Sequence, residues 1–358
     1  MKILVISLAG IGDTLLATPL IRELRANFPD AVIDALMRWP GAKDLLENNP
    51  HLNRIYQRDL VKASRFESFC FLHSLLKEHY DVSINTHPQS QMLYRLAARV
   101  VGAPRRLSHE YECSGWLDRL LVNRTLPQNY DKHSIENNLD LLPFLNAQPK
   151  LDRHEMEVCL TADGEAWADA FLTAHDLHRR LWLGVHVGSG STKNLRLKRW
   201  PLAHYVELVK KLNRQRPDVS VLLFGGPEEE KDHDVVLAQA DARLVLRTET
   251  KNLRQAAALM KRCNAFLSVD TALMHLAAAV KVRQQIVVEA PTLNRTNLPY
   301  GNPFTLVRNP AVAGRNLEYY RYDGRDIQGT QEELLRCMAS VRVEDVYHAV
   351  DRALRNSG

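Results

Sequence analysis

Cysteine is sparse and scattered in this chain of 358 residues. No CxxC spacing occurs, and the five cysteines are Cys70, Cys113, Cys159, Cys263 and Cys337. An odd and dispersed set of this kind is neither a disulfide framework nor a zinc ribbon, and it fits a reducing cytosol. We therefore expect a cytoplasmic protein.

Long apolar runs are also lacking. No stretch approaches the roughly 18–20 apolar residues that a membrane-spanning helix needs. The N-terminus has one lysine and a short apolar segment, but Asp13 follows at once and the segment is needed as a first strand. We therefore do not interpret it as a signal peptide.

Several well-known site motifs are missing. There is no HExxH, no Cys/His cluster, no GxxxxGK[ST] loop and no Gly-x-Ser-x-Gly elbow. No Lys/Arg-rich tract carries interleaved aromatics, so we expect no nucleic-acid partner. The Asp-x-Asp sequence at Asp232-His233-Asp234 lies in a highly charged helical stretch, and we interpret it as solvated surface and not as a metal site.

What the chain does have is the composition of a soluble globular protein of about two domains, with 45% hydrophobic and 25% charged residues. The formal net charge of +5 is compatible with an anionic substrate or an anionic membrane face, and it proves neither.

Both halves of the chain alternate strands with helices. In the first half, the apolar run 3–6 and the segments 31–37 and 81–85 are predicted as the first three strands, and 91–101 as a helix. In the second half, the predicted strands are 181–187, 219–224, 265–269 and 285–288, with a helix at 202–212. The last segment, 343–354, is an amphipathic helix that could pack on either domain. This order predicts two Rossmann-like α/β domains with parallel sheets and a boundary near 160–180.

The turn Gly10-Ile11-Gly12-Asp13 joins the first strand to a helix. Such a turn offers backbone N–H groups and the positive end of a helix dipole to an anion. A third glycine is absent because Leu15 stands in its place, so the dinucleotide fingerprint fails. Asp13 either caps the helix or serves as a charged base in a cleft, and the two roles are partly compatible. Ligands gather at the carboxyl ends of parallel strands, where Asp13 and His87 are expected.

Three further segments follow strands of the second half. Gly188-Ser189-Gly190-Ser191-Thr192, with Lys198-Arg199-Trp200-Pro201 downstream, suits a diphosphate, although an ordinary polar loop is an equal alternative. Asp270-Thr271 opens an alanine-rich helix that contains His275, which is either a site residue or a packed histidine. Gly225-Gly226-Pro227 with Glu228, Glu229 and Glu230 could hold ribose hydroxyls, or the acids could simply favour a helix start.

The first half also carries cations beside aromatics. Arg54, Arg58, Lys62 and Arg65 precede Phe66, Phe69 and Phe71, and Arg95, Arg99, Arg105 and Arg106 follow the third predicted strand. These side chains could meet an anionic acceptor or a membrane surface. Scattered solvated charge and core aromatics are the alternative, which we favour for most of them.

Taken in order, the motifs resemble those of glycosyltransferase family 9, the lipopolysaccharide heptosyltransferases, almost end to end. The resemblance rests on these segments: Gly12-Asp13, Thr18-Pro19-Leu20, Phe28-Pro29, Gly102-Ala103-Pro104-Arg105-Arg106, His133, Asn138-Leu139, His186, Gly188-Ser189, Lys198-Arg199-Trp200-Pro201, Gly225-Gly226-Pro227, Asp270-Thr271 and Met274-His275-Leu276-Ala277-Ala278-Ala279.

The resemblance implies a GT-B fold, in which two doubly wound Rossmann-like domains face each other across a cleft. We expect an acceptor domain at 1–165, a nucleotide-sugar domain at 175–335 and a C-terminal helical segment at 336–358. Asp13 matches the family's catalytic base. Ser189, Lys198, Glu229, Asp270, Thr271, Ala272, Leu273 and His275 match its donor contacts, and we expect Gly12, Thr14, His87 and Arg105 at the acceptor.

The resemblance further implies an inverting transfer of a sugar, by family default heptose from ADP-heptose, to a lipopolysaccharide-core or related anionic glycolipid or glycan. We expect that no cofactor or metal is required and that Mg²⁺ acts at most as a non-essential enhancer. Peripheral contact with the cytoplasmic face of the inner membrane is compatible with such an acceptor. A sugar-nucleotide epimerase or hydrolase, and a non-catalytic nucleotide- or glycan-binding protein, are the alternatives.

Three departures from the family pattern affect the donor loop. Ala272 stands where the family usually has glycine, Val187 where it usually has proline, and Glu289-Ala290-Pro291-Thr292 replaces Phe-Gly-Pro-Thr. Extra residues also separate Ser189 from Lys198. The choice of donor is therefore a family default and not a deduction from these residues.

Overall fold

The computed structural model describes residues 1–177, 180–190, 194–322 and 326–356, which fold as two compact units. Unit 1 comprises Met1–Cys159 and, much later in the chain, Tyr322. Unit 2 comprises the rest, from Leu160 onward. Among the described residues, every helix is too short or too polar to cross a lipid bilayer.

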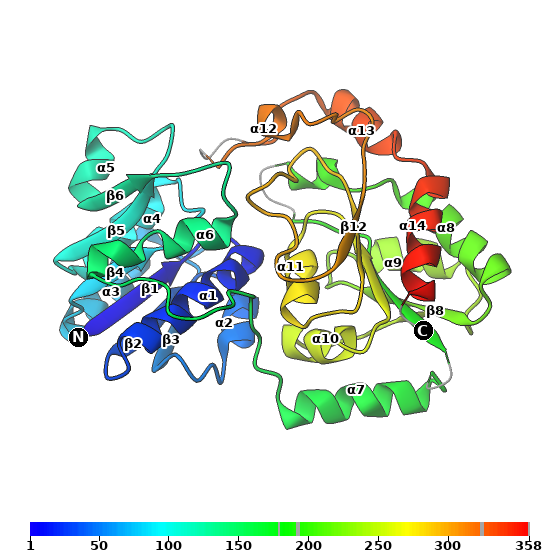
Figure 1. The fold of residues 1–358 in the computed structure, drawn as a ribbon, viewed down its shortest axis with the longest axis horizontal. Coiled ribbons are helices and arrows are strands. Elements are labelled where there is room, and N and C mark those ends of the chain that lie inside the picture. The colour runs from blue at the N-terminus through cyan, green and yellow to red at the C-terminus, as the bar shows by residue number, and fades with distance from the viewer. Residues whose placement is uncertain (178–179, 191–193, 323–325, 357–358) are drawn as a thin grey trace. The chain divides into compact units, whose positions relative to one another are not determined.

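Unit 1 is built on a six-stranded parallel sheet in the order β3-β2-β1-β4-β5-β6 (Figure 1). Its elements are β1 Lys2–Ser7, α1 Ile11–Asn27, β2 Val32–Met37, α2 Pro40–Leu46, β3 Arg54–Gln57, α3 Arg65–Ser74, the 3₁₀ helix η1 Leu75–Glu78, β4 Val82–Asn85, α4 Met92–Val101, β5 Arg105–Glu110, α5 Trp116–Leu121, β6 Arg124–Pro127, α6 Ser134–Leu139 and η2 Leu142–Leu145.

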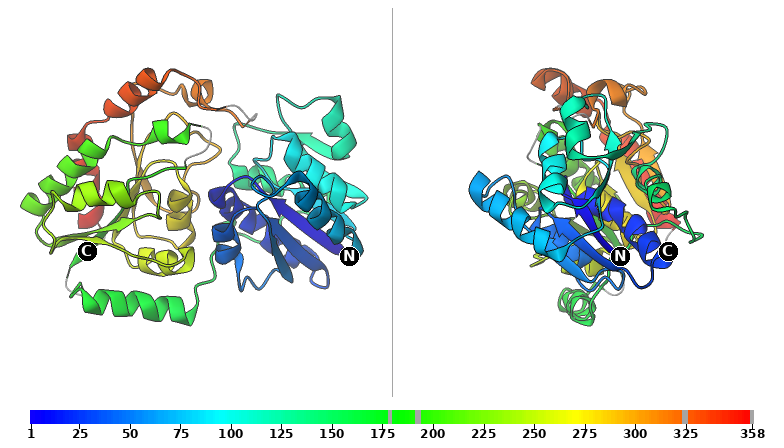
Figure 2. Two further views of the ribbon diagram at one scale, coloured as in Figure 1. Left: turned by 180° about the vertical axis from the view of Figure 1, so that it is seen from behind. Right: turned by 90° about the vertical axis from the view of Figure 1, so that its left-hand side faces the viewer.

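Helices cover both faces of this sheet, as parallel strands require. α1 packs against α2 and α6 on one face, which Figure 1 shows in front. α3, α4 and α5 pack side by side on the other face, which the view from behind in Figure 2 shows. The central strands are apolar and almost wholly buried because both of their faces are covered.

Unit 2 repeats the arrangement with the order β12-β11-β10-β7-β8-β9, again all parallel. Its elements are α7 Ala162–Ala174, β7 Leu181–His186, η3 Leu195–Lys198, α8 Leu202–Gln215, β8 Val219–Phe224, α9 Glu230–Leu237, β9 Val245–Arg247, α10 Leu253–Met260, β10 Ala265–Ser268, α11 Ala272–Ala279, β11 Gln285–Val288, β12 Phe304–Val307, α12 Asn316–Tyr319, α13 Gln331–Ala339 and α14 Val343–Arg355.

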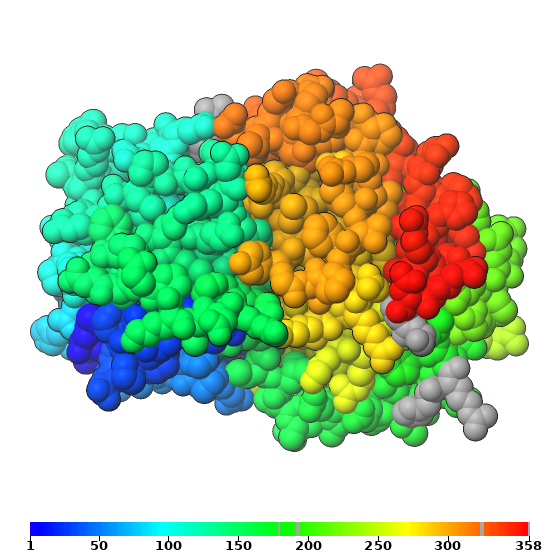
Figure 3. Space-filling view, viewed as in Figure 1, coloured from blue at the N-terminus to red at the C-terminus, as the bar shows by residue number. Residues whose placement is uncertain are grey.

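The last segment of each unit is held against that unit by hydrogen bonds or by packing. The backbone N–H groups of Lys150 and Leu151 donate to the buried carboxylate of Glu23 on α1, at 2.8 Å each. In the space-filling view of Figure 3, green atoms of this stretch lie over the blue atoms of unit 1. The C-terminal helix α14 packs on α8 and on β11 of unit 2, which settles the domain that it joins.

Two expectations from the sequence were wrong. The strand predicted as the third, 81–85, is the fourth, because β3 at Arg54–Gln57 precedes it. The aromatic residues of α3 are not core residues, since the exposed fractions of Phe66 and Phe69 are 76% and 51%. Only Phe71 packs, half-buried, against the core beneath α3 and α4.

Candidate active site

The order of the strands marks one place on the carboxyl edge of unit 1. The chain leaves β1 toward β2 and β3 on one side, and later crosses to β4, β5 and β6 on the other. Such a switch point leaves a crevice where ligands of open α/β sheets usually bind. The residues that follow β1 and β4 here include Asp13 and His87, so the expectation that both lie at this edge is confirmed.

Asp13 is the third residue of α1, half-buried, with its carboxylate folded back over the helix start. A Cβ atom built on Gly10 would lie 2.7 Å from Asp13 Oδ2, so the carboxylate occupies space that only a glycine leaves open. The first turn of the helix, with its N–H groups and dipole, stabilises an anion there. The carboxylate is thus held at the helix start and is partly exposed to solvent.

His87 lies on the other side of the switch point, completely buried among aromatic rings. Its backbone N–H donates to Asn138 Oδ1 at 2.7 Å, and its Nδ1 lies 3.1 Å from the hydroxyl of Tyr111. The rings of Tyr111 and His109 lie 5.7 and 5.5 Å from that of His87, between centroids. Asn138 also donates to the carbonyl of Leu16 on α1 at 3.2 Å, so one amide joins the end of β4 to α1 and α6.

Burial keeps the two neighbouring histidines of this group, His87 and His109, neutral. Burial, with the neighbouring His109 and His133, lowers the pKa of His87 well below its usual value. Burial likewise lowers the pKa of His109 to about 4, against an opposing bond from its ring to the carbonyl of Asn137. The Tyr111 hydroxyl accepts the N–H of Gln89 at 2.8 Å, so its own proton is available to His87 Nδ1. Neither ring can therefore replace Asp13 as a charged group.

Of the other residues expected at the acceptor, Gly12 and Thr14 flank Asp13 on α1, whereas Arg105 lies at the opposite edge of the sheet. Gly12 is buried within the first turn of α1. Thr14 is fully buried, and its hydroxyl donates to the carbonyl of Gly10 at 3.1 Å and lies 3.3 Å from Ser7 Oγ. Arg105 begins β5 at the amino edge of the sheet, near Met1, which is the opposite edge from Asp13. Grouping Arg105 with Asp13 was therefore wrong, because a whole strand separates them.

In unit 2 the switch point lies between β7 and β10, and an ion pair marks it. Lys198 Nζ lies 3.3 Å from Asp270 Oδ2, and both side chains are almost completely buried. Lys198 ends η3 in the loop after β7, whereas Asp270 follows β10. Two charges leave water at this depth only when each satisfies the other or a ligand does.

Asp270 has two more partners that the sequence did not reveal. Thr292 Oγ1 donates to Asp270 Oδ2 at 2.6 Å, and Asn297 Nδ2 donates to the same oxygen at 3.1 Å. Burial acts to raise the pKa of Asp270, but Lys198, the Thr292 hydroxyl and His275 outweigh it, so the pKa is lowered. Asp270 is thus a firmly ionised anchor that holds the Lys198 ammonium at the sheet edge.

A second ionic group follows β7 and β8. Arg199 donates to Ser189 Oγ at 3.1 Å, to Glu229 Oε1 at 3.3 Å and to Asp232 Oδ2 at 3.0 Å. Glu229 Oε2 accepts the N–H of Gly226 at 3.0 Å, and its side chain fills the space where Gly188 would carry a Cβ. Burial raises the pKa of Glu229, partly offset by the Gly226 N–H and by Arg199. Of the glycine-hydroxyl loop, 191–193 lie outside the described residues.

The donor loop itself begins α11. Thr271 caps this helix by accepting the N–H of Met274 at 3.4 Å, and its hydroxyl lies 3.2 Å from His186 Nδ1. His186 was not among our candidate site residues, and burial with His233, Arg199 and Lys198 lowers its pKa to about 3. Ala272, Leu273 and His275 occupy the first turn of α11, with Leu273 and His275 buried. The structure therefore gathers all the expected donor residues along the carboxyl edge of one sheet.

Two sequence features receive a plain structural explanation. Glu289, one of the departures from the family pattern, is buried and accepts the N–H of Asn309 at 2.8 Å, so it fastens the end of β11 to the end of β12. Within Asp232-His233-Asp234, only Asp234 is well exposed. His233 is buried and Asp232 pairs with Arg199, so reading all three as solvated surface was wrong.

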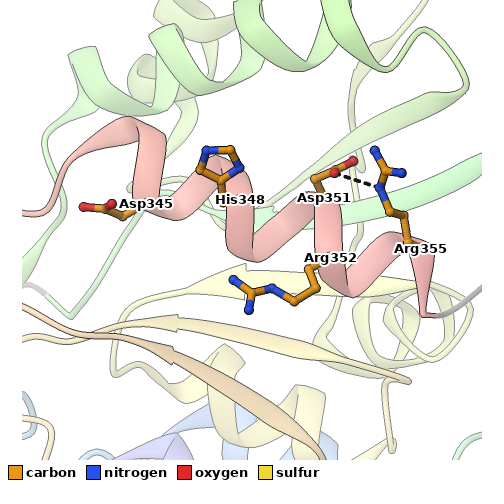
Figure 4. Close-up of a pocket in the computed structure, with 5 residues that line it drawn as sticks. All are labelled: Asp345, His348, Asp351, Arg352 and Arg355. Atoms are coloured by element: carbon orange, nitrogen blue, oxygen red, sulfur yellow. Dashed lines mark hydrogen bonds and ion pairs between the residues drawn. The ribbon is translucent and has the colours of Figure 1, made fainter.

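A shallow pocket on α14 is a different kind of feature. Figure 4 shows the five side chains that line it, which all project from this one helix: Asp345, His348, Asp351, Arg352 and Arg355. Asp351 accepts from Arg355 at 2.9 Å and also pairs with Arg216. Asp345, His348 and Asp351 pair with neighbouring side chains. Since none of the pocket residues follows a strand, we do not regard it as the active site.

Comparison with known proteins agrees with this geometry. The family model described as glycosyltransferase family 9 (heptosyltransferase) matches residues 69–320. The chain belongs to this family. It is therefore a glycosyltransferase, and the resemblance in its sequence motifs is confirmed.

Individual relatives of the family cover most of the chain. Lipopolysaccharide heptosyltransferase 2 of Escherichia coli K12 is 27% identical over 86% of this chain and 88% of its own. Lipooligosaccharide heptosyltransferase 2 of Haemophilus influenzae is 26% identical over 86% and 88%. Among solved structures, a family 9 glycosyltransferase of Veillonella parvula superposes with a TM-score of 0.78 at 20% identity, covering 99% of this chain and 97% of its own.

The structure titled E. coli ADP-heptose lps heptosyltransferase II gives a TM-score of 0.73 at 20% identity, with 99% of each chain covered. At that identity the likeness shows the fold alone. The fold is GT-B, an α/β architecture of two Rossmann-like units, as the family resemblance implied.

Proposed function

We propose that this family 9 glycosyltransferase transfers heptose from ADP-heptose, or a closely similar nucleotide sugar, to a lipopolysaccharide-core acceptor. The observation that carries the proposal is the buried cationic edge of unit 2, where Lys198 and Arg199 follow one strand and Asp270 and Thr271 follow its neighbour. The relatives named above are heptosyltransferases of lipopolysaccharide and lipooligosaccharide, which supports the choice of sugar and acceptor.

Unit 2 is proposed to bind the diphosphate of the donor. An ammonium has three donors, of which the Asp270 carboxylate takes one, and the others can serve phosphate oxygens. Arg199 adds a second cation, and the N–H groups at the start of α11 offer further bonds to an anion. Because these groups are held by buried partners, they stabilise the charge that develops on the leaving diphosphate without first having to reorganise.

Unit 1 is proposed to supply the base. The acceptor hydroxyl attacks the anomeric carbon, the bond from that carbon to the diphosphate oxygen breaks, and Asp13 takes the hydroxyl proton. Attack on the side opposite the leaving group inverts the anomeric centre. General-base assistance of this kind is worth roughly 10²–10⁴-fold in rate.

The cations of unit 2 can stabilise the diphosphate leaving group without a divalent ion, so we propose that no metal is required and that Mg²⁺ acts at most as an enhancer. Glu229 is proposed to accept a ribose hydroxyl. Since Arg199 and the Gly226 N–H orient its carboxylate, exchange of one of these bonds for a ribose hydroxyl is a local change.

A two-stage experiment tests the proposal. A thermal-shift screen against ADP-heptose and other nucleotide sugars should rank ADP-heptose first, because a ligand at 100 times its Kd stabilises a protein by about 2.7 kcal/mol. Transfer is then measured with a heptose-deficient lipopolysaccharide core as acceptor. Turnover of the donor without acceptor would indicate an epimerase or hydrolase, and binding without any transfer would indicate a non-catalytic protein.

A further inference from the structure

Unit 1 exposes a group of large apolar side chains on one face of its sheet. They project from the three neighbouring helices α3, α4 and α5 and from the loop before α3, and we call them the apolar face: Val61, Phe66, Phe69, Met92, Leu93, Leu96, Trp116, Leu117 and Leu120. Phe66 and Trp116 are exposed by 76% and 73%. An apolar group of this extent on one surface marks an interaction site more often than scattered single residues do.

The position of this face follows from the topology. In a parallel sheet, each helix that follows a strand starts at the carboxyl edge and runs back to the amino edge. Phe66 and Phe69 lie in the first half of α3, and Met92, Leu93 and Leu96 in the first half of α4. The apolar face is therefore at the edge of unit 1 that also carries Asp13 at the start of α1.

Cations stand among these apolar side chains. Lys62 and Arg65 flank α3 at its start, Arg99 follows Leu96 by three residues on α4, and Arg119 lies between Leu117 and Leu120 on α5. All four are exposed. Long basic side chains beside aromatic and aliphatic ones are the pattern of surfaces that bind anionic lipid, where rings enter the headgroup layer and cations meet phosphates.

The acidic side chains nearby do not cancel this pattern. Glu67 accepts the N–H of Ser64 at 3.1 Å and pairs with Arg58, and Glu110 pairs with Arg119 at 3.3 Å. Asp118 is bonded to the buried Arg95 and to the N–H of Gly115. Glu112 is the remaining exposed acid of the loop before α5.

We propose that the apolar face docks unit 1 on a bilayer that contains anionic phospholipid. A second copy of this chain is a poorer occupant, because a two-fold contact would bring Lys62, Arg65 and their counterparts against one another. Docking would bring Asp13 to the side of the membrane where a lipid-borne acceptor presents its sugar. That consequence rests on the proposed function, whereas the docking itself does not.

The test is cosedimentation of the full chain with vesicles, in the absence of donor and acceptor. We expect binding to vesicles of phosphatidylethanolamine with phosphatidylglycerol and little binding to pure phosphatidylcholine. Raising the salt from 0.1 to 0.5 M should weaken binding several-fold, since the Debye length falls from about 10 Å to about 4.5 Å. Equal binding to both kinds of vesicle would contradict the role of the cations.

Matched variants locate the surface. Phe66→Ser with Trp116→Ser should lower the partition coefficient about tenfold or more, because both rings leave the interface. Lys62→Glu with Arg65→Glu should abolish the preference for anionic lipid. The controls are Val235→Ser with Leu335→Ser, and Lys251→Glu with Arg352→Glu, which change exposed residues of unit 2 and should leave binding intact.

Two outcomes separate this proposal from the proposed function. If the aromatic variant binds vesicles as well as the parent chain, the docking surface is overturned, whatever the transfer activity. If it loses vesicle binding but still transfers sugar to a delipidated core oligosaccharide, docking and chemistry are shown to be separate properties. If the chain dimerises with increasing concentration and the same variant abolishes the dimer, the apolar face binds a second copy of the chain, and the proposal of membrane docking is contradicted.

Discussion

The two sheets of this molecule have the same strand order, yet their carboxyl edges carry different chemistry. At the switch point of unit 1 stand one carboxylate, Asp13, and a buried group of neutral rings around His87. At the equivalent point of unit 2 stand Lys198, Arg199 and their carboxylate partners. The same backbone thus carries the proposed proton acceptor in one unit and the proposed anion site in the other, and only the residues after the strands distinguish them.

The largest expected difference between the two units is the effect of a substitution at Asp13 on transfer activity. Asp13→Asn should lower transfer by about 10²–10⁴-fold, because the amide cannot take the proton of the acceptor hydroxyl. The Kd for the donor should stay the same, since that site belongs to unit 2. Steady-state kinetics and calorimetry measure the two quantities, and Asp30→Asn, at an exposed turn, is the control. Near-normal turnover of the Asp13 variant would show that Asp13 is not the general base.

The counterpart in unit 2 is Lys198. Lys198→Met should weaken binding of the nucleoside diphosphate by about 10–100-fold, the equivalent of one or two charge-assisted hydrogen bonds. The variant also leaves Asp270 buried without its cation, so the free energy of unfolding should fall as well. Binding is read by calorimetry below the melting temperature, with Lys251→Met as the matched control. An unchanged Kd would contradict the role of Lys198.

Acid should affect the two units alike, which sharpens the comparison. In the unfolded chain a histidine has a pKa near 6.5, whereas burial lowers the pKa of His109 and His233 to about 4 and that of His186 to about 3. Below pH 6.5 the unfolded state therefore binds protons that the folded state does not, and stability falls as the pH falls. At pH 5 each such histidine costs about 2 kcal/mol of the free energy of unfolding.

Denaturant unfolding at pH 7 and pH 5 measures this loss. His233→Gln should reduce the difference in the free energy of unfolding between pH 7 and pH 5 by the contribution of one histidine. His348→Gln, at an exposed position, should leave that difference unchanged.

At still lower pH, protonation of Asp270 should lower the free energy of unfolding further, and this loss belongs to unit 2. Because its pKa is lowered in the folded state, its stabilisation is present above the pKa of about 3.9 of an unfolded aspartate, and it disappears as the pH falls through the folded pKa.

A smaller effect is expected at Thr292. Thr292→Val removes the hydroxyl that donates to Asp270, so the Lys198–Asp270 pair should be less well oriented and donor affinity should fall several-fold. Thr292→Ser keeps the hydroxyl and is the matched control. Equal donor affinities of the valine and serine variants would show that Lys198 needs no support from this bond.

The smallest effect is expected from removing metal. Because unit 2 supplies its own cations, EDTA should change the initial rate of transfer by less than about twofold, on the reasoning that two fixed cations already face the leaving group. A rate that falls to background with EDTA and returns with Mg²⁺ would show that Lys198 and Arg199 do not suffice.

Much of this organisation could be predicted from the sequence, because the central strands are continuous apolar runs and the site residues follow them directly. β5 and the four edge strands, β3, β6, β9 and β12, were missed, because their sequences are short or rich in polar residues. Edge strands are recognised by the neighbour that they pair with, and that neighbour is distant in the chain.

The partners within the site could not be predicted for a related reason. Thr292 and Asn297 lie in loops and Asn138 lies in α6, and their bonds reach 22, 27 and 51 positions away. Asn138 and Thr292 lie in segments that we compared with the family pattern, but nothing in the sequence indicates which group each of them bonds. Arg105 shows the opposite error, because a cation next to family motifs was assigned to the site although it begins its strand at the far edge.

The space above Gly10 has a consequence for how substitutions in this enzyme would be tolerated. The backbone at Gly10 is extended, so alanine fits it without strain, and the added methyl would meet only the tip of the Asp13 side chain. A carboxylate tip can rotate aside, which leaves the fold intact and displaces the carboxylate that we propose as the proton acceptor. In a survey of every substitution, position 10 should therefore be as intolerant for growth as position 13, while the protein accumulates normally, although this residue has no reactive atom of its own.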